Sequence, residues 1–275
     1  MNGIDFTSDP VIRLSVFILL LALLALLENI SPRRKPRYSK GSRWISNFGI
    51  SILNSTTVAM ILPIVGAGAA LLADERNWGL FNRLDTPALF SIPLYIIAFD
   101  LTIYVQHRLF HKFKPLWRLH RMHHTDLDYD VSTGVRFHPL SIFISAGIKL
   151  GLILALGPLA IAVIVSEIVL NATSMFNHSN IKLPHRLDAA LRYFIVTPDM
   201  HRIHHSVIAQ EHNRNFGFNF PWWDKIFNTY KDQPSKGQDA IDIGISGYEE
   251  DISIGILPLL IQPFRKDRES HRESS

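Results

Sequence analysis

Histidine is the residue type in this chain whose number and spacing point most directly to chemistry. The chain has 13 histidines among its 275 residues, and 12 of them lie between His107 and His212. Imidazole titrates near neutral pH and is the commonest metal ligand among side chains. Four motifs hold nine of these residues: H-x3-H, H-x2-H-H, the single histidine of "FNHSN", and a second H-x2-H-H. The nine histidines are His107, His111, His120, His123, His124, His178, His201, His204 and His205.

The spacing of these motifs predicts a metal site with two ions. Residues three or four apart lie on the same face of an α-helix. A single histidine is most often a surface residue or a hydrogen-bonded core residue, but two copies of H-x2-H-H in one chain are not expected by chance. One ion cannot use nine imidazoles, whereas two ions with four or five ligands each can do so and keep positions open. Imidazole binds zinc, copper, iron and nickel alike, so the ligand type alone does not identify the metal.

A long helix is expected to carry the first motif. It should continue through "DLTIYVQHRLFH" until Pro115 interrupts it. One stripe of this helix contains Asp100, Tyr104, His107 and His111. Asp100 is the leading candidate to accept a hydrogen bond from the second ring nitrogen of a metal-bound histidine, and the alternative is a carboxylate at the headgroup level. His138 is a second candidate for such an orienting role, whereas His185 and His212 are expected to be solvated.

Two shorter helices and an aromatic segment complete the expected site. A helix over 116–124 would carry the first H-x2-H-H motif, and another should begin at "TPDM" with Thr197 as N-cap and Pro198 at the first position. Segment 216–230 contains Trp222, Trp223, Phe227 and Tyr230 among polar residues. Such aromatic residues favour the membrane interface, so this segment is expected to cover the site or to line the substrate entrance.

Apolar stretches predict an integral membrane protein. Hydrophobic residues make up 47% of the chain and charged residues 19%, whereas about 25% charged residues is usual for a soluble domain. Because roughly 20 apolar residues cross a bilayer as a helix, segments 11–30, 50–72 and 87–106 are predicted as spans. Segment 140–176 is about twice that length, with Gly157-Pro158 near its middle. It is predicted to form a helical hairpin that enters and leaves on the same side, and whether it crosses fully is left open.

Basic residues orient these spans. Segment 31–43 has six Lys/Arg and no acidic residue, whereas segment 73–86 has two Lys/Arg and three acidic residues. The positive-inside rule therefore places 31–43 in the cytoplasm and 73–86 outside. Counting spans from there returns His107 and every later histidine motif to the cytoplasmic face, which would be that of the inner membrane in a bacterium. The fold class expected is all-α: a multi-span transmembrane helical bundle with a cytoplasmic helical cap that holds the dinuclear site.

Composition excludes several other kinds of site. The chain has no cysteine, which excludes disulfides, thiolate metal sites, iron–sulfur clusters and cysteine nucleophiles. The formal net charge of +4 suits an anionic lipid surface. No motif for nucleic-acid recognition is present in the sequence, so nucleic acid is not an expected partner.

The order of the histidine motifs resembles that of the fatty acid hydroxylase / sterol desaturase superfamily of integral-membrane di-iron oxygenases. "RFHP" at 136–139 and "NFGFNFPWWDKIFNTY" at 215–230 are similar to the segments that flank the last two motifs in this superfamily, and "LLIQPF" at 259–264 is similar to its closing segment. Two positions depart from the pattern. Ser141 stands where an acid is frequent, and Asn228 where a glycine is usual.

The resemblance implies a membrane-bound, O2-dependent oxidoreductase that hydroxylates or desaturates a C–H bond of a sterol, fatty acyl chain or related lipid. It implies that the nine histidines hold two iron ions, for which zinc could substitute. Since no flavin, NAD or haem motif is visible, electrons should come from an external donor such as a ferredoxin or a cytochrome b5-type protein. The same resemblance divides the chain into an anchor region with two spans (1–86), a catalytic domain (87–231) and a cytoplasmic tail (232–275).

Two other functions stay open at this point. A pterin-dependent ether-lipid monooxygenase of the same superfamily is not separated from a hydroxylase or desaturase by any feature of the sequence. A membrane metal transporter or sensor would also use clustered histidines. Transport favours ionisable residues near the middle of several spans, whereas these histidines lie beyond the ends of the predicted spans.

Overall fold

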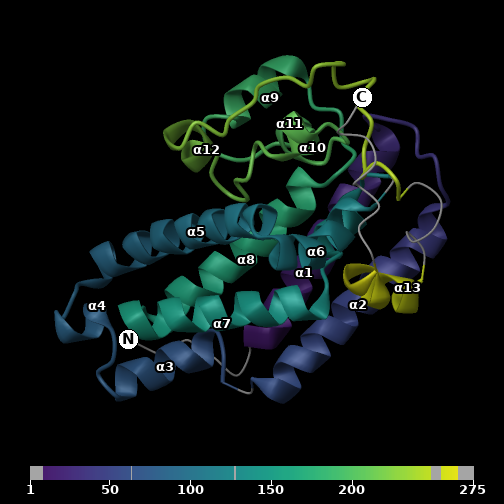
Figure 1. Ribbon diagram of the computed structural model, residues 1–275. Helices are drawn as coiled ribbons and strands as arrows, with labels where there is room; N and C mark the ends of the chain where they lie inside the picture. The colour runs from purple at the N-terminus through teal and green to yellow at the C-terminus, as the bar shows by residue number, and fades with distance from the viewer. Residues whose placement is uncertain (1–8, 63, 127, 249–254, 266–275) are drawn as a thin grey trace.

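The computed structural model describes residues 9–62, 64–126, 128–248 and 255–265. Within these ranges the secondary structure is helical, with two isolated β-bridges and no sheet. Four of the described helices are long and apolar enough to cross a membrane: α1 (Asp9–Ile30), α5 (Ala88–Lys112), α7 (Pro139–Leu156) and α8 (Ala160–Asn177). The chain is therefore an integral membrane protein built as a helical bundle (Figure 1).

The predicted span 50–72 is wrong. In its place α2 (Lys40–Ile61) begins earlier, ends at the middle of that segment, and is followed by α3 (Ala67–Glu75). Four polar residues of α2 explain the difference, because Arg43, Ser46, Asn47 and Asn54 are buried against protein. Asn54, for example, is buried and its side-chain amide donates to the Phe137 carbonyl at 2.8 Å. By length and composition, α2 is not among the four candidate spans.

The hairpin predicted over 140–176 is confirmed, with its turn at the expected dipeptide. Gly157 ends α7 in the left-handed conformation (φ 61°, ψ 55°), and α8 begins three residues later. This turn packs against Gly79, which precedes α4 (Leu80–Arg83); a Cβ on Gly79 would lie 2.1 Å from the Gly157 nitrogen. Both positions therefore need glycine. Each helix of the hairpin has 18 residues and is long enough to span a bilayer.

Contacts at the two ends of the bundle show where the loops lie. The chain beyond α1 pairs with the chain beyond α8, because Pro32 and Ile181 form a β-bridge and the Arg33 N–H donates to the Asn180 carbonyl at 2.8 Å. Segment 31–43 thus lies at the end of the bundle that carries His178. The Gly79–Gly157 contact places segment 73–86 at the opposite end (Figure 1). That the first of these ends faces the cytoplasm stays a prediction.

Short helices gather at the end of the bundle that carries His178, above α5 and α8 in Figure 1 and beside the upper part of α2. They form the helical cap expected from the sequence. They are α6 (Lys114–His124), the 3-10 helix η2 (Val131–Val135), α9 (His185–Leu191), α10 (Pro198–His204), α11 (Ala209–His212), α12 (Trp222–Ile226), α13 (Ile256–Ile261) and η3 (Gln262–Phe264).

The local signals for two of these helices are confirmed. α5 stops at Lys112 and Pro115 lies in the first turn of α6. The Thr197 hydroxyl caps α10 by accepting a hydrogen bond from the Met200 N–H, with Pro198 at the first helical position. The apolar core of the bundle lies below this cap, where α5, α7 and α8 pack Tyr95, Phe99, Ile103, Ile153 and Val163 together.

Candidate metal centre

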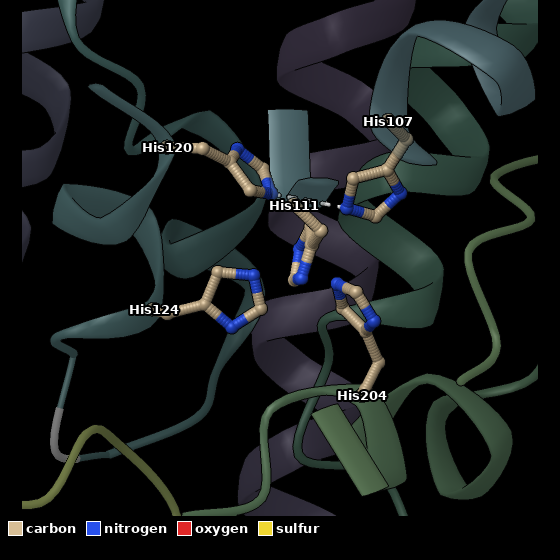
Figure 2. A group of neighbouring side chains, drawn as sticks. All are labelled: His107, His111, His120, His124 and His204. Atoms are coloured by element: carbon tan, nitrogen blue, oxygen red, sulfur yellow. Dashed lines mark hydrogen bonds between the residues drawn. The ribbon is translucent and has the colours of Figure 1, made fainter. Parts of the chain in front are cut away.

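The nine predicted histidines converge at one end of the bundle in two groups. In each group, one ring nitrogen per histidine lies within 4.8 Å of those of the other members. Group 1 consists of His107, His111, His120, His124 and His204, whose rings surround a common centre (Figure 2). Group 2 consists of His123, His178, His201 and His205. All nine side chains are buried except His111, which is half-buried.

Helical periodicity divides the motifs between the groups. The H-x3-H pair on α5 belongs entirely to group 1, and His178, the C-cap of α8, belongs to group 2. Each H-x2-H-H motif is shared. On α6 the two histidines four residues apart face group 1 and the middle one faces group 2, whereas on α10 and its C-cap the pair faces group 2 and the middle one faces group 1.

Backbone carbonyls fix the orientation of four rings. A carbonyl can only accept a hydrogen bond, so each Nδ1 that faces one must carry the proton, which leaves Nε2 with a lone pair. The four hydrogen bonds run from His107 to Phe216 O (2.7 Å), from His204 to Arg214 O (2.8 Å), from His123 to Arg136 O (3.2 Å) and from His178 to Ser174 O (2.7 Å).

One close contact in group 2, between two ring nitrogens, has no proton with which to form a hydrogen bond. The Nε2 atoms of His123 and His178 are 3.0 Å apart, although both rings carry their proton on Nδ1. Protonating one ring would solve this, but burial lowers the pKa of His178 to about 3 and that of His123 well below its usual value. Two lone pairs therefore face each other at close range. A metal ion that accepts both lone pairs removes this repulsion.

Several other ring nitrogens are buried without a hydrogen-bond partner among the described residues. Leaving such a group unsatisfied costs about 1–3 kcal/mol each. They are both ring nitrogens of His111, Nε2 of His124 and His204, and Nδ1 of His201 and His205. Burial also lowers the pKa values of the group members on α6 and α10, which keeps these rings neutral, the form that binds metals. The donor set and its unpaired nitrogens thus fit two metal ions.

Phenylalanine rings enclose the two groups. The Phe216 ring centroid lies 5.1–5.5 Å from those of His107, His111 and His204. Phe218 lies 5.0 Å from His107 and 5.8 Å from His201, so it touches both groups. Such apolar walls exclude water from the histidines. Phe216 and Phe218 belong to the segment expected to cover the site, and they do so directly.

Two buried carboxylates hold the segment that carries these phenylalanines. Asp100 accepts a 2.7 Å hydrogen bond from the Trp223 indole and two of 3.3 Å from the backbone N–H groups of Asn219 and Phe220. The expected hydrogen bond from a histidine to Asp100 is thus replaced by contacts that position the covering segment. Asp224 accepts from the N–H groups of Phe216 and Gly217 at 2.9 and 2.8 Å. Asp224 thereby fixes the carbonyl that orients His107.

A buried ionic network supports the end of α6. Asp126, two residues after His124, pairs with Arg43 of α2 through two hydrogen bonds of 2.8 Å. This guanidinium holds the pKa of Asp126 down at about 2 despite burial. The Arg136 side chain donates to the Met122 carbonyl at 3.0 Å, and its own carbonyl accepts from His123. The network therefore joins α2, α6 and η2 behind group 2.

The histidines outside the two groups have different surroundings. His138 caps α7, accepting from the Leu140 N–H at 3.1 Å, and its Nε2 donates to the Leu260 carbonyl at 3.2 Å. His185 is exposed, as expected. His212 was expected in solvent, and this expectation is wrong. It is half-buried and stacked on Trp117 at 5.5 Å, with its ring centroid 6.0 Å from that of His111.

Some neighbours of the site could not be recognised from the sequence. Tyr129 is buried with its ring 5.1 Å from His205 and 5.6 Å from His178, and its hydroxyl donates to the Asn177 carbonyl at 2.6 Å. Phe137 stacks on His123 at 4.5 Å. Tyr129 stands at no motif spacing, and Phe137 lies in the "RFHP" segment but is not a metal-ligating residue type; both reach the site through the turn of the chain between α6 and α7.

Comparison with known proteins adds a family to this geometry. A family model described as fatty acid hydroxylase matches residues 92–229, half of the chain. An ornithine lipid hydroxylase, OlsE, from Rhizobium tropici is 26% identical over 261 residues, which cover 92% of this chain and 76% of that protein. An alkylglycerol monooxygenase from Homo sapiens is 28% identical over 166 residues, which cover 58% of this chain and 35% of that protein. The chain thus spans about a third of the human protein's length. No solved structure matches the chain.

Proposed function

Since the chain belongs to the fatty acid hydroxylase family and is a lipid-oxidising enzyme of the membrane, we propose that it is a di-iron, O2-dependent hydroxylase or desaturase. Its substrate would be a sterol, a fatty acyl chain or a related lipid. The nine histidines of groups 1 and 2 would hold the two irons, with zinc as a substitute. An external electron donor, such as a ferredoxin or a cytochrome b5-type protein, would supply the electrons.

The contact between His123 and His178 is the observation that most supports two metal ions. Two neutral rings, each with its proton on the far nitrogen, have no reason to approach to 3.0 Å unless a cation lies between them. Iron bound there would supply the redox chemistry that reduces O2 and makes an unactivated C–H bond reactive. The protein's own part is to fix the rings through Phe216, Arg214, Arg136 and Ser174 carbonyls and to keep water out with its phenylalanines.

Comparative lipid analysis tests this function. Lipids from cells with and without the protein should differ by one class that has gained an oxygen atom or lost two hydrogen atoms. A strain that expresses the His123→Ala variant is the control, because it makes the same membrane protein with an incomplete group 2. An identical lipid profile in all three strains, with the wild-type protein present and iron-loaded, would contradict the proposal.

An ether-lipid monooxygenase is the second candidate, favoured by the alkylglycerol monooxygenases among the relatives. Such an enzyme would draw its electrons from a reduced pterin rather than from a protein donor. Turnover of an alkylglycerol by the purified protein, dependent on added tetrahydropterin, would establish this alternative. Turnover with a reduced ferredoxin and no pterin would exclude it.

A further inference from the structure

A shallow hollow opens on the surface next to group 2. It lies just beyond the last residues of two candidate spans, Ile30 of α1 and Asn177 of α8. Its walls include Arg34 and Asn180, which follow those spans directly in the chain. Because lipid headgroups lie at the ends of membrane-spanning helices, the hollow is at headgroup level.

Arg34 gives this hollow a positive charge that forms no ion pair with the described residues. Its backbone is held on both sides by Asn180, whose Oδ1 accepts from the Arg34 N–H at 3.2 Å and whose Nδ2 donates to the Arg34 carbonyl at 2.7 Å. The guanidinium itself is half-buried and makes no hydrogen bond or ion pair with any residue that the structure describes. Burial, together with the charges of Arg37 and Arg202, lowers the pKa of Arg34, while the charges of Asp242 and Asp128 act in the opposite direction.

The acidic residues of the hollow are already engaged. The Asp128 carboxylate accepts hydrogen bonds of 2.8–3.0 Å from the backbone N–H groups of Arg37 and Tyr38. Asp130 accepts from Arg43 at 2.6 Å and from the Trp44 indole at 3.2 Å. Neither carboxylate therefore forms a hydrogen bond or ion pair with Arg34, although the charge of Asp128 attracts it. The hollow presents a guanidinium that has no direct partner among the described residues.

The hollow is connected with both the membrane and the metal centre. On the membrane side, α1 exposes a stripe of apolar residues that ends four residues before Arg34 in the chain; the stripe is Leu19, Leu23, Leu26 and Ile30. On the inner side, Tyr129 forms part of the wall, and the same ring contacts His178 and His205. One side chain thus separates the hollow from group 2.

We propose that this hollow binds the anionic group, a carboxylate or a phosphate, of the substrate's headgroup, with Arg34 as its main cation. An acyl chain would then lie along the exposed stripe of α1, and the substrate would be a lipid with a negatively charged headgroup. A guanidinium suits this purpose because its planar fork can bind two oxygens of a carboxylate or phosphate at once. The substrate role rests on the proposed function, whereas the binding of an anionic amphiphile does not.

Binding to the iron-loaded, detergent-solubilised full-length protein tests the proposal without turnover. The probes are dihexanoylphosphatidylglycerol and N-octanoylglycine, which are anionic, together with uncharged dihexanoylglycerol and inorganic phosphate. At least one anionic amphiphile should bind, and Arg34→Gln should weaken its Kd at least about tenfold, which corresponds to about 1.4 kcal/mol. Arg34→Lys should lose less, because it keeps the charge but not the fork.

Arg186→Gln is the matched control. Arg186 is exposed on α9, at the same end of the molecule, and its loss removes the same charge. This variant should bind the anionic probe like the wild type, and metal content should be equal in all variants. Failure of both anionic amphiphiles to bind, or binding that Arg34→Gln leaves unchanged, would overturn the proposal. So would equal affinity for dihexanoylglycerol, and equal affinity for free phosphate would show an ion site rather than a headgroup site.

Turnover separates this inference from the proposed function. With a lipid that the enzyme oxidises, Arg34→Gln should raise KM at least about tenfold and leave kcat within about twofold. If no lipid is oxidised by the wild type but Arg34 still governs binding, the enzymatic proposal fails and the headgroup site stands. If turnover is normal in Arg34→Gln, the headgroup site fails and the enzymatic proposal stands.

Discussion

Four of the nine histidines are oriented by a backbone carbonyl behind the ring. His107 and His204 donate from Nδ1 to carbonyls of the chain that follows α10, and His123 donates from Nδ1 to the Arg136 carbonyl. The convergence of the nine histidines could be predicted because the spacing within each motif is local in the sequence, and their binding of metal stays a prediction. Their partners could not be predicted, because a backbone carbonyl has no sequence signal and Phe216 is 109 residues away from His107.

Alanine at any histidine of the two H-x2-H-H motifs should abolish activity, because each variant removes a ligand from a shared centre. His123→Ala is the most informative, with His138→Ala as its control. His138 caps α7 and donates to the Leu260 carbonyl but belongs to neither group, so its loss should cost about 1 kcal/mol of stability and leave the metal content unchanged. Metal analysis of the purified variants measures the difference. Full turnover in any two of the motif variants would contradict a shared centre.

At the scale of helices, local signals were reliable where the chain begins or ends an element. Thr197-Pro198, Pro115 and Gly157 each act through the backbone of their own turn, so their effects could be predicted. The prediction for α2 failed because hydropathy does not distinguish a helix face against lipid from one against protein. Asn54 is buried against the Phe137 carbonyl, and a sequence cannot show that partner.

The pair of Arg43 and Asp126 ties α2 to the end of α6, and its loss should be costly. Asp126→Asn would remove one of the two carboxylates that pair with the fully buried Arg43 guanidinium and leave Asp130, which is expected to lower the free energy of unfolding by about 2 kcal/mol. Asp128→Asn is the control, since its partners are backbone N–H groups near the surface and its loss should cost less than about 1 kcal/mol. Equal denaturation midpoints for the two variants in detergent would contradict this role of the buried pair.

At the scale of the whole molecule, the loops at the two ends of the bundle differ in charge. Segment 31–43, with its six basic residues, shares one end of the bundle with every histidine of the centre, and segment 73–86 lies at the other end. The sequence predicted this arrangement even though it assigned one span wrongly, because α2 still runs between the two ends (Figure 1).

The absence of cysteine makes the orientation of the protein measurable. A single cysteine in place of Glu75 should react with a membrane-impermeant maleimide on intact cells, since the positive-inside rule puts that loop outside. A single cysteine in place of Lys35 should react only after lysis. Both side chains are exposed, so access to the reagent is the variable that differs. Labelling of Lys35→Cys on intact cells would show that the orientation is the opposite of the predicted one.

Removing the metals should loosen the whole bundle, because groups 1 and 2 join α5, α6, α8 and α10. A free metal concentration of about 1,000 times Kd adds about 4 kcal/mol to the free energy of unfolding. In a chain of this size each kcal/mol of that free energy shifts Tm by about 2–4 °C. Chelation should therefore lower Tm by about 8 °C or more. The variant with both His123→Ala and His204→Ala should show little change on chelation. A wild-type Tm that does not respond to metal removal would contradict the metal centre.

The shared motifs also limit how this protein can vary. Each H-x2-H-H helix faces both groups, so inserting one residue ahead of His120 would turn the motif by about 100° and misdirect rings toward both centres at once. A change in the length of the loop between His178 and Thr197 does not rotate a motif on its helix. Insertions and deletions should thus be tolerated between the motif-bearing helices and rejected within them, and the two centres can only be gained or lost together.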